Sequence, residues 1–328
     1  IISQRNKPES HDCEIAWCEF TDDHDGLWLR YLHDLRFHHN LVDNLNDDGL
    51  EFGAKKHDHL IHVYQNRVSR CLLTLTLHQM DTGESAAQAG ETSGVYITRN
   101  IFDLRDGGFR GYPQEQDPSG KYRRVPGMLC GDHGSPTWPN YYFYHNTVLR
   151  TDPSWRGYYG CGIGGRATRD SRRRGFNNIF VQEQGLPGLV FSSGPDDIQI
   201  DGNLHWGLRE GPGVVGDFFK THGRRGAFRR KPYPKTWMVH DVFADPKLVA
   251  VAGAGPHRVG VSLRTGSPAI DAGVTLPSGP GGPWHDPLRE SDRGRPDIGA
   301  VPAGQKPWSV GIGGRVTLAG ELRPRAAR

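Results

Sequence analysis

The stretch from residue 35 to residue 52 alternates apolar and polar positions around a single asparagine, Asn40. Alternation with a period of two predicts short strands that bury one face. A polar turn and Gly49 follow, and they lead into a further short strand over residues 50–52. The apolar positions lie five and three places before the asparagine and two places after it: Leu35, Phe37 and Val42.

The same spacing recurs along the chain, which predicts a repeating unit rather than a set of unrelated strands. Repetition of one supersecondary unit indicates a solenoid, in which successive coils stack. Asparagine tolerates the left-handed backbone of a sharp corner, and stacked asparagines can hydrogen-bond from coil to coil. We therefore predict an all-β fold, a parallel β-helix of about seven coils; a β-sandwich with unrelated asparagines is the alternative. Further units centre on Asn66, Asn100, Asn146 and Asn203, with a partial unit at Asn178 and with Cys18 in the asparagine position of the first.

Length and composition agree with this interpretation. A chain of 328 residues would suit two average domains, but a solenoid grows without dividing. The 44 glycines and 23 prolines suit a fold with many turns. Because the repeat fades after residue 210, we predict coils over 1–235, an irregular closing segment over 236–304 and a tail over 305–328.

Net charge and hydropathy exclude some partners. The formal charge is only +3, so no overall attraction to nucleic acid is expected. No apolar run reaches the roughly 18 residues of a membrane-spanning helix, so we expect no membrane span. The first coil begins without a cap, and we expect an upstream export signal and a secreted or periplasmic protein. We expect a monomer.

Carboxylates gather at the turn before two successive strands. Asp25 precedes one glycine, and Asp47 and Asp48 precede another, at separations of 22 and 23 residues along the chain. Because this separation equals one coil, these side chains are predicted to lie at the same corner of adjacent coils. Asp23 and Glu51 are expected close by.

Such a cluster has three possible uses. Neighbouring carboxylates raise the pKa of at least one member of a pair, which suits a general acid beside a general base. Inverting glycoside hydrolysis places its two carboxyls about 6.5–9.5 Å apart, with a water between them. Aspartate before glycine is also ordinary turn chemistry, and stacked acids can hold calcium. Catalysis, cation binding and turn structure all stay open.

Basic residues form a second row at the other end of the same strands. A line of cations beside a line of acids predicts a groove for an acidic sugar chain. In a lyase, the same side chains would take the proton next to a carboxylate; the alternative is a solvated face. The row is found six places after the aligned glycine positions and consists of Lys55, His78, His133 and Arg166.

An aromatic side chain stands beside the acids. Trp28 alternates with the apolar residues Leu27 and Leu29, so it is predicted to point outward. Sugar rings stack on aromatic faces much as nucleic-acid bases do. Trp28 is therefore a predicted substrate-binding residue, with ordinary packing as the alternative.

The coil pattern over residues 11–206 resembles the pectate-lyase-like family of right-handed parallel β-helix proteins. The segments GSPAIDAG (266–273) and DRGRPDIGAVP (292–302) resemble the closing segment of many bacterial members. The motifs DHDG and NDDG resemble the paired aspartates of polygalacturonase-type glycoside hydrolases, which implies Asp48 as proton donor and Asp25 and Asp47 as the residues that activate water. The next motif of that family, Gly-His-Gly, has no counterpart at residues 70–72.

The sequence thus predicts a carbohydrate-active enzyme that cleaves glycosidic bonds of a polysaccharide or oligosaccharide. Inverting hydrolysis by the aspartates is the first hypothesis and needs no cofactor or metal. A polysaccharide lyase that acts on an acidic chain, with Ca²⁺ held by the acids, is the second. A carbohydrate-binding solenoid without catalytic activity is the third.

Overall fold

The computed structural model describes most of the predicted strands. The described residues are 12–29, 32–52, 59–77, 94–105, 127–132, 140–150, 172–182, 198–207, 236, 238–250, 261–276 and 286–312. Within these ranges the chain is all-β, with turns and without an α-helix.

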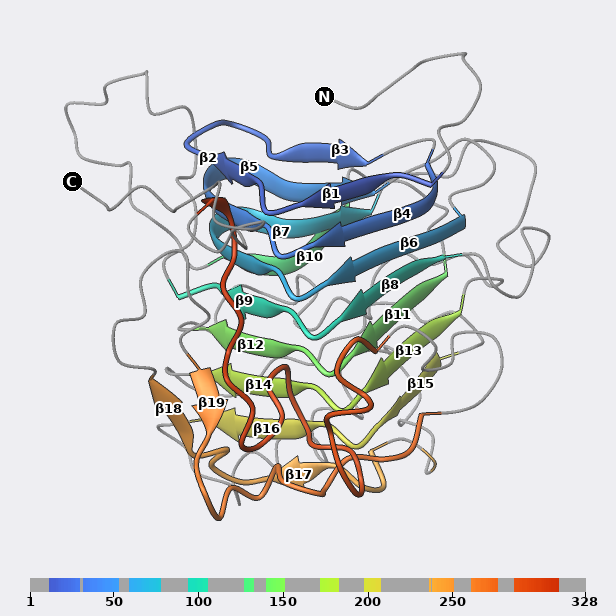
Figure 1. Cartoon of the computed structure of the whole chain (residues 1–328), viewed down its shortest axis with the longest axis vertical. Helices are drawn as coiled ribbons and strands as arrows, with labels where there is room; N and C mark the ends of the chain where they lie inside the picture. Colours follow the sequence, from blue (N-terminus) through green and yellow to red (C-terminus); the bar gives the residue numbers. More distant parts are fainter. Residues whose placement is uncertain are drawn as a thin grey trace, which may run out of the picture.

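Two large sheets run along the length of the molecule, with their strands stacked one above the other (Figure 1). The seven-stranded sheet has the order β1 (Glu14–Ala16), β4 (His33–His38), β6 (His59–Tyr64), β8 (Val95–Thr98), β11 (Tyr141–Tyr144), β13 (Arg173–Phe176) and β15 (Ile198–Asp201). The ten-stranded sheet has the order β17 (Val242–Phe243), β16 (Leu204–Gly207), β14 (Ile179–Gln182), β12 (Thr147–Arg150), β9 (Ile101–Asp103), β7 (Arg67–Leu77), β5 (Leu41–Phe52) and β2 (Glu19–Thr21), with β3 (Leu27–Leu29) beside β5 and β10 (Met128–Asp132) beside β7. A separate antiparallel pair consists of β18 (Leu248–Ala250) and β19 (Val261–Leu263).

Every pairing in the two large sheets is parallel, and the chain alternates between the sheets. β4, for example, is followed by β5 in the other sheet, and β6 then returns to pair with β4. Parallel strands that pair one turn of the chain apart are the arrangement of stacked coils. The structure is therefore consistent with the predicted parallel β-helix.

The predicted asparagines form a buried ladder between the coils. The backbone N–H of Asn40 donates to Oδ1 of Asn66 at 2.8 Å, and that of Asn66 donates to Oδ1 of Asn100 at 3.0 Å. Each side-chain amide also donates to the asparagine of the next coil and to a carbonyl of the coil before. The same pattern continues through Asn146, Asn178 and Asn203, all fully buried.

The ladder begins and ends at residues that lack the amide. The N–H of Cys18 donates to Asn40 at one end, and at the other end the N–H of Asn203 donates to Oδ1 of Asp241. An aspartate carboxylate accepts hydrogen bonds but cannot donate one, so Asp241 ends the chain of donors. Its second oxygen lies 2.7 Å from Nε2 of the buried His205.

The expected reason for asparagine at the corner was wrong in one respect. The left-handed backbone falls on the residue before each ladder position, not on the asparagine itself. These preceding residues have φ between 52° and 66° and are Trp17, His39, Gln65, Arg99, His145, Asn177 and Gly202. The asparagine suits this position because its amide hydrogen-bonds to the coils on both sides. The residue before it adopts the strained left-handed backbone.

Apolar side chains of the predicted slots meet between the two sheets. Leu35, Phe37, Val42, Ile61, Val63, Val68, Val95, Ile97, Phe102, Phe143, Val148 and Ile200 belong to one buried cluster. In the partial unit at Asn178, Arg173 takes an apolar slot and is fully buried, with its guanidinium 5.9 Å from the centre of the Tyr141 ring. An arginine stem packs like an apolar chain and its charge is attracted to the ring face, so the coil keeps its register.

One predicted register was wrong. Alignment of Gly26, Gly49 and Leu72 at steps of 23 residues predicts that Leu27, Leu50 and Leu73 pair in turn. Leu27 does pair with Leu50, but Leu50 pairs with Leu75. The register shifts between Leu45 and Asp48 of β5, where one extra residue forms a bulge. The strands pair 26 residues apart before the bulge and 25 residues apart after it, not 23, so Glu51 lies beside Thr76 and not Thr74.

Residues near the C-terminus pack along the coils through a buried ionic cluster. Arg99 donates to Asp286 at 2.9 Å, to Asp292 at 2.7 Å and to the Gly299 carbonyl at 2.9 Å. Burial alone would raise the pKa of Asp286, but the Arg99 guanidinium holds it below its usual value. These salt bridges link the corner after β8 to residues 286–292.

None of the helical turns found in the described ranges has the length and apolar character required to cross a membrane. The expectation of no membrane span agrees with this finding.

Replacement of Asn100 by alanine should destabilise the protein by about 2–5 kcal/mol, because it leaves the N–H of Asn66 and the carbonyl of Val63 buried without their partner. Chemical denaturation measures the loss. Asp245→Ala, at an exposed position, is the control. A loss below about 1 kcal/mol would show that the ladder does not hold the coils together.

Arg99→Met should cost about 3–5 kcal/mol at neutral pH, since it leaves two buried carboxylates without their cation. Because the folded pKa of Asp286 is depressed, the stabilisation is present above about pH 4, the unfolded value, and is lost as the pH falls through the folded pKa. Denaturation at pH 7 and at low pH should show the gap between variant and wild type shrinking. Arg105→Met, which removes an exposed pair with Asp103, should change little at either pH.

Candidate functional site

Stacked glycines bring the predicted aspartates together. The N–H of Gly26 donates to the Asp48 carbonyl at 2.7 Å, so the two turns lie directly on one another. A Cβ on Gly26 would lie 2.2 Å from the Gly49 carbonyl oxygen, and a Cβ on Gly49 would lie 2.7 Å from that of Thr74. Only glycine permits this approach, and the residue before each glycine is an aspartate.

Backbone hydrogen bonds hold the rest of the turn in place. The N–H of Asn46 donates to the Asp23 carbonyl at 3.1 Å, and that of Asp47 donates to the His24 carbonyl at 2.9 Å. The Asp23 carboxylate in turn accepts the His24 N–H at 2.7 Å. Successive backbone hydrogen bonds therefore attach the turn between β2 and β3 to β5.

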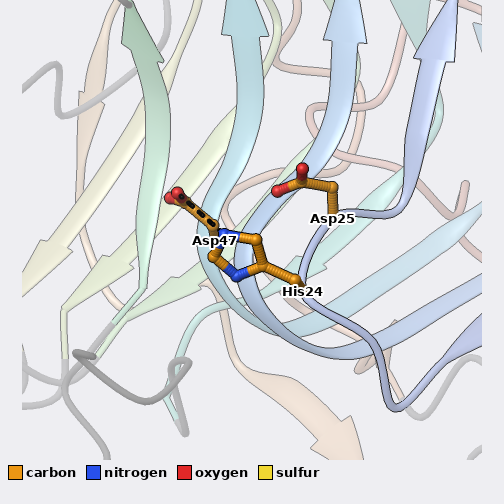
Figure 2. Close-up of side chains that lie close together, drawn as sticks. All are labelled: His24, Asp25 and Asp47. Atoms are coloured by element: carbon orange, nitrogen blue, oxygen red, sulfur yellow. Dashed lines mark ion pairs between the residues drawn. The ribbon is translucent and has the colours of Figure 1, made fainter. Parts of the chain in front are cut away.

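Two groups of side chains converge at this point and share Asp25. Oxygens of Asp25, Asp48 and Glu51 all lie within 4.8 Å of one another. Ligand atoms of His24, Asp25 and Asp47 do so as well, and Nε2 of His24 lies 4.0 Å from Oδ2 of Asp47 (Figure 2). Five titratable side chains from two adjacent coils thus occupy one corner.

Exposure divides the cluster into an inner and an outer part. Asp48 is 1% exposed and Glu51 is 3% exposed. Oδ1 of Asp48 accepts a hydrogen bond of 2.5 Å from the buried hydroxyl of Thr76. The side chains of His24 and Asp47, in contrast, are 44% and 31% exposed. The inner carboxylates are held by the protein, and the outer groups are open to solvent.

The structure brings four of the predicted residues together: Asp25, Asp47, Asp48 and Glu51. Trp28 lies on the same strand pair, in register with Glu51, and is 37% exposed on the outer face. Asp23 is exposed and caps the turn through the His24 N–H. The predicted basic row lies outside the described residues: Lys55, His78, His133 and Arg166.

Two residues of the site were not predicted. His24 stands inside the DHDG motif, between two residues that were selected, but only the stacked turn shows that its ring lies beside Asp47. Thr76 was missed because of the register error: the strands pair 25 residues apart at this point, which places Thr76 beside Glu51. A hydroxyl in the neighbouring strand carries no sequence signal of its own.

The inner group has the composition of a site for a hard cation. Calcium takes oxygen ligands at about 2.3–2.6 Å, so two oxygens on opposite sides of the ion lie roughly 5 Å apart. The separations among Asp25, Asp48 and Glu51, all within 4.8 Å, fit that span. The outer group adds the imidazole nitrogen of His24, a ligand that suits transition metals better than calcium.

A cavity of about 410 Å³ lies elsewhere, in the closing segment. It contains none of the predicted site residues, and two of its acids already have partners: Asp292 binds Arg99, and Asp297 accepts the N–H groups of Asp271 and Ala303. The turn cluster on β3 and β5 is therefore the better candidate.

Comparison with known proteins gives no match. No protein-family model matches the chain, and neither the curated proteins nor the solved structures searched contain one that does. The resemblance to pectate-lyase-like proteins therefore stays a prediction from the sequence motifs, and the site is interpreted from its own geometry.

If Asp25, Asp48 and Glu51 hold a cation, calcium should raise the melting temperature and EDTA should reverse the rise. A ligand that binds the folded state and not the unfolded state stabilises the folded state. Asp48→Asn and Glu51→Gln should abolish the shift. Asp201→Asn, which changes a carboxylate at the end of β15 that pairs with His240, should leave the shift unchanged. A calcium response that survives in both inner variants would contradict the assignment.

Proposed function

We propose that this protein is a carbohydrate-active enzyme that cleaves glycosidic bonds of a polysaccharide on a right-handed parallel β-helix of about seven coils. One observation carries the proposal: acids remote along the chain gather on adjacent coils, with the half-exposed Trp28 on the same strands. An aromatic face beside a polar cluster is the usual way to hold a sugar ring next to reactive groups.

The geometry favours β-elimination on an acidic polysaccharide over hydrolysis. Inverting hydrolysis requires carboxyls about 6.5–9.5 Å apart with a water between them. Oxygens within 4.8 Å of one another, two of them on buried side chains, are better suited to sharing a small cation. A cation at Asp25, Asp48 and Glu51 would also attract the carboxylate of an acidic sugar.

Elimination needs a base but no water. The base takes the proton from the carbon next to the sugar carboxylate, a carbon–carbon double bond forms, and the bond to the glycosidic oxygen breaks, after which that oxygen takes a proton. A cation held by Asp25, Asp48 and Glu51 would supply charge stabilisation for this step. The predicted basic row would provide the base, and His24 is an additional group of suitable chemistry at the open side of the cluster.

Hydrolysis is the second candidate because the outer side chains are accessible. Asp25 and Asp47 are half-buried rather than buried, so both could reach a water and a substrate. Asp48, the implied proton donor, would need to act from a nearly buried position beside Thr76. Either reaction on an external polysaccharide fits an exported, monomeric enzyme.

A panel of acidic and neutral polysaccharides separates the candidates. Elimination creates an unsaturated product that absorbs in the ultraviolet, whereas hydrolysis creates only new reducing ends. We expect reducing ends together with ultraviolet absorbance on an acidic chain, and loss of both when EDTA is added. Asp48→Asn should lower turnover by at least about a hundredfold, the scale of losing one electrostatic group in a site.

The matched control is Asp201→Asn, which should retain full turnover. Reducing ends without absorbance, unaffected by EDTA, would favour hydrolysis. Sugar binding without any turnover would show a carbohydrate-binding solenoid and would reject both reactions.

A further inference from the structure

The end of the described chain runs along the coils instead of around them. Residues 297–312, here called the strap, follow the corner that carries the ladder, from the level of β14 towards β2 (red trace in Figure 1). Within the strap only Ser309 forms an isolated β-bridge, so the strap is attached through single contacts and is not a strand of either sheet.

The lower part of the strap is anchored to three coils. The N–H of Gly299 donates to the Asn177 carbonyl at 2.8 Å, and the N–H of Ala300 donates to Oγ1 of Thr147 at 3.0 Å. The Gly299 carbonyl accepts from Arg99. In each of these three coils, the strap contacts the residue with left-handed backbone or a residue close to it.

The upper part reaches the first two coils. The N–H of Gly311 donates to the His39 carbonyl at 2.8 Å, and the N–H of Ile312 donates to Oε1 of Glu19 at 2.8 Å. Val310 is fully buried in a cluster with Leu41. The last two described residues therefore hold the two coils at the outer end of the stack.

These two coils are the ones that carry the candidate site. Glu19 begins β2, which leads within a few residues into the turn with His24 and Asp25. His39 lies just before β5, which carries Asp47, Asp48 and Glu51. In the described part of the chain, β1 and β2 are edge strands that each pair with one neighbour only, as β15 and β17 do at the other end of the stack.

We propose that the strap positions the candidate site: by holding Glu19 and His39 together, it fixes the turn with His24 and Asp25 against the acids of β5. Glu19 is the positioning residue. The part of this inference that concerns turnover rests on the proposed function, but the part that concerns the order of the first two coils does not.

Two glycines offer a matched test. Gly311 and Gly304 both have positive φ, 64° and 75°, so alanine strains the backbone about equally at each. A Cβ on Gly311 would lie 2.7 Å from the Glu19 side chain, whereas a Cβ on Gly304 has no atom within 4 Å. Gly311→Ala should therefore displace the upper anchor, and Gly304→Ala should not.

Hydrogen exchange of the backbone amides is the first readout. Gly311→Ala should speed exchange in β1, β2 and the turn after β2 by about two- to tenfold, the effect of losing one or two hydrogen bonds. Exchange in β14 and β16 should match the wild type, and Gly304→Ala should match it throughout. Equal effects of the two variants, or an effect spread over all coils, would overturn the proposal.

Turnover is the second readout. Glu19→Leu removes the acceptor of the Ile312 N–H, and Glu19→Gln keeps an oxygen there. Glu19→Leu should lower kcat and the calcium-induced shift together, and Glu19→Gln should restore both. If the wild type cleaves no polysaccharide, the proposed function fails while hydrogen exchange still decides the role of the strap. Full turnover in Glu19→Leu would reject the positioning role.

Discussion

The asparagine ladder is the interaction on which the rest of this structure depends. Each amide accepts the backbone N–H of one coil and donates to the next, so every asparagine satisfies buried groups on both sides of its own coil. A carboxylate only accepts, and a hydroxyl has one donor hydrogen where each of these amides uses two. Because unsatisfied polar groups are costly in an apolar interior, the ladder ties the register of each coil to that of its neighbour. It ends at Asp241, which can only accept.

Because the coils stack in register, residues that are one coil apart in the sequence become neighbours in space. Asp25 and Asp48 belong to different coils, yet the glycine that follows each of them lets the two turns rest on one another. The result is a graded cluster. Asp48 and Glu51 are buried and fixed, and His24 and Asp47 face solvent. Buried acids beside solvent-exposed groups would suit the proposed cleavage of an acidic polysaccharide, because the buried acids stay fixed while the exposed groups can reach a substrate.

The corner that makes the ladder possible also makes the strap possible. The left-handed residue before each asparagine turns its carbonyl or side chain away from the core, where the closing segment can bind it. Arg99, His145 and Asn177 all contact that segment in this way. A stack whose contacts are otherwise made only between neighbouring coils thereby gains links between distant ones.

The sequence alone was sufficient to predict the stacked parallel strands, the asparagine positions and the meeting of Asp25 with Asp47 and Asp48, because these follow from a local period that repeats. It was not sufficient to predict the bulge in β5, the place of Thr76 or the approach of His24 to Asp47. A bulge adds one residue to one strand without changing the local pattern of apolar positions. Burial of Asp48 and attachment of the strap depend on segments far apart in the chain, so only the tertiary structure decides them.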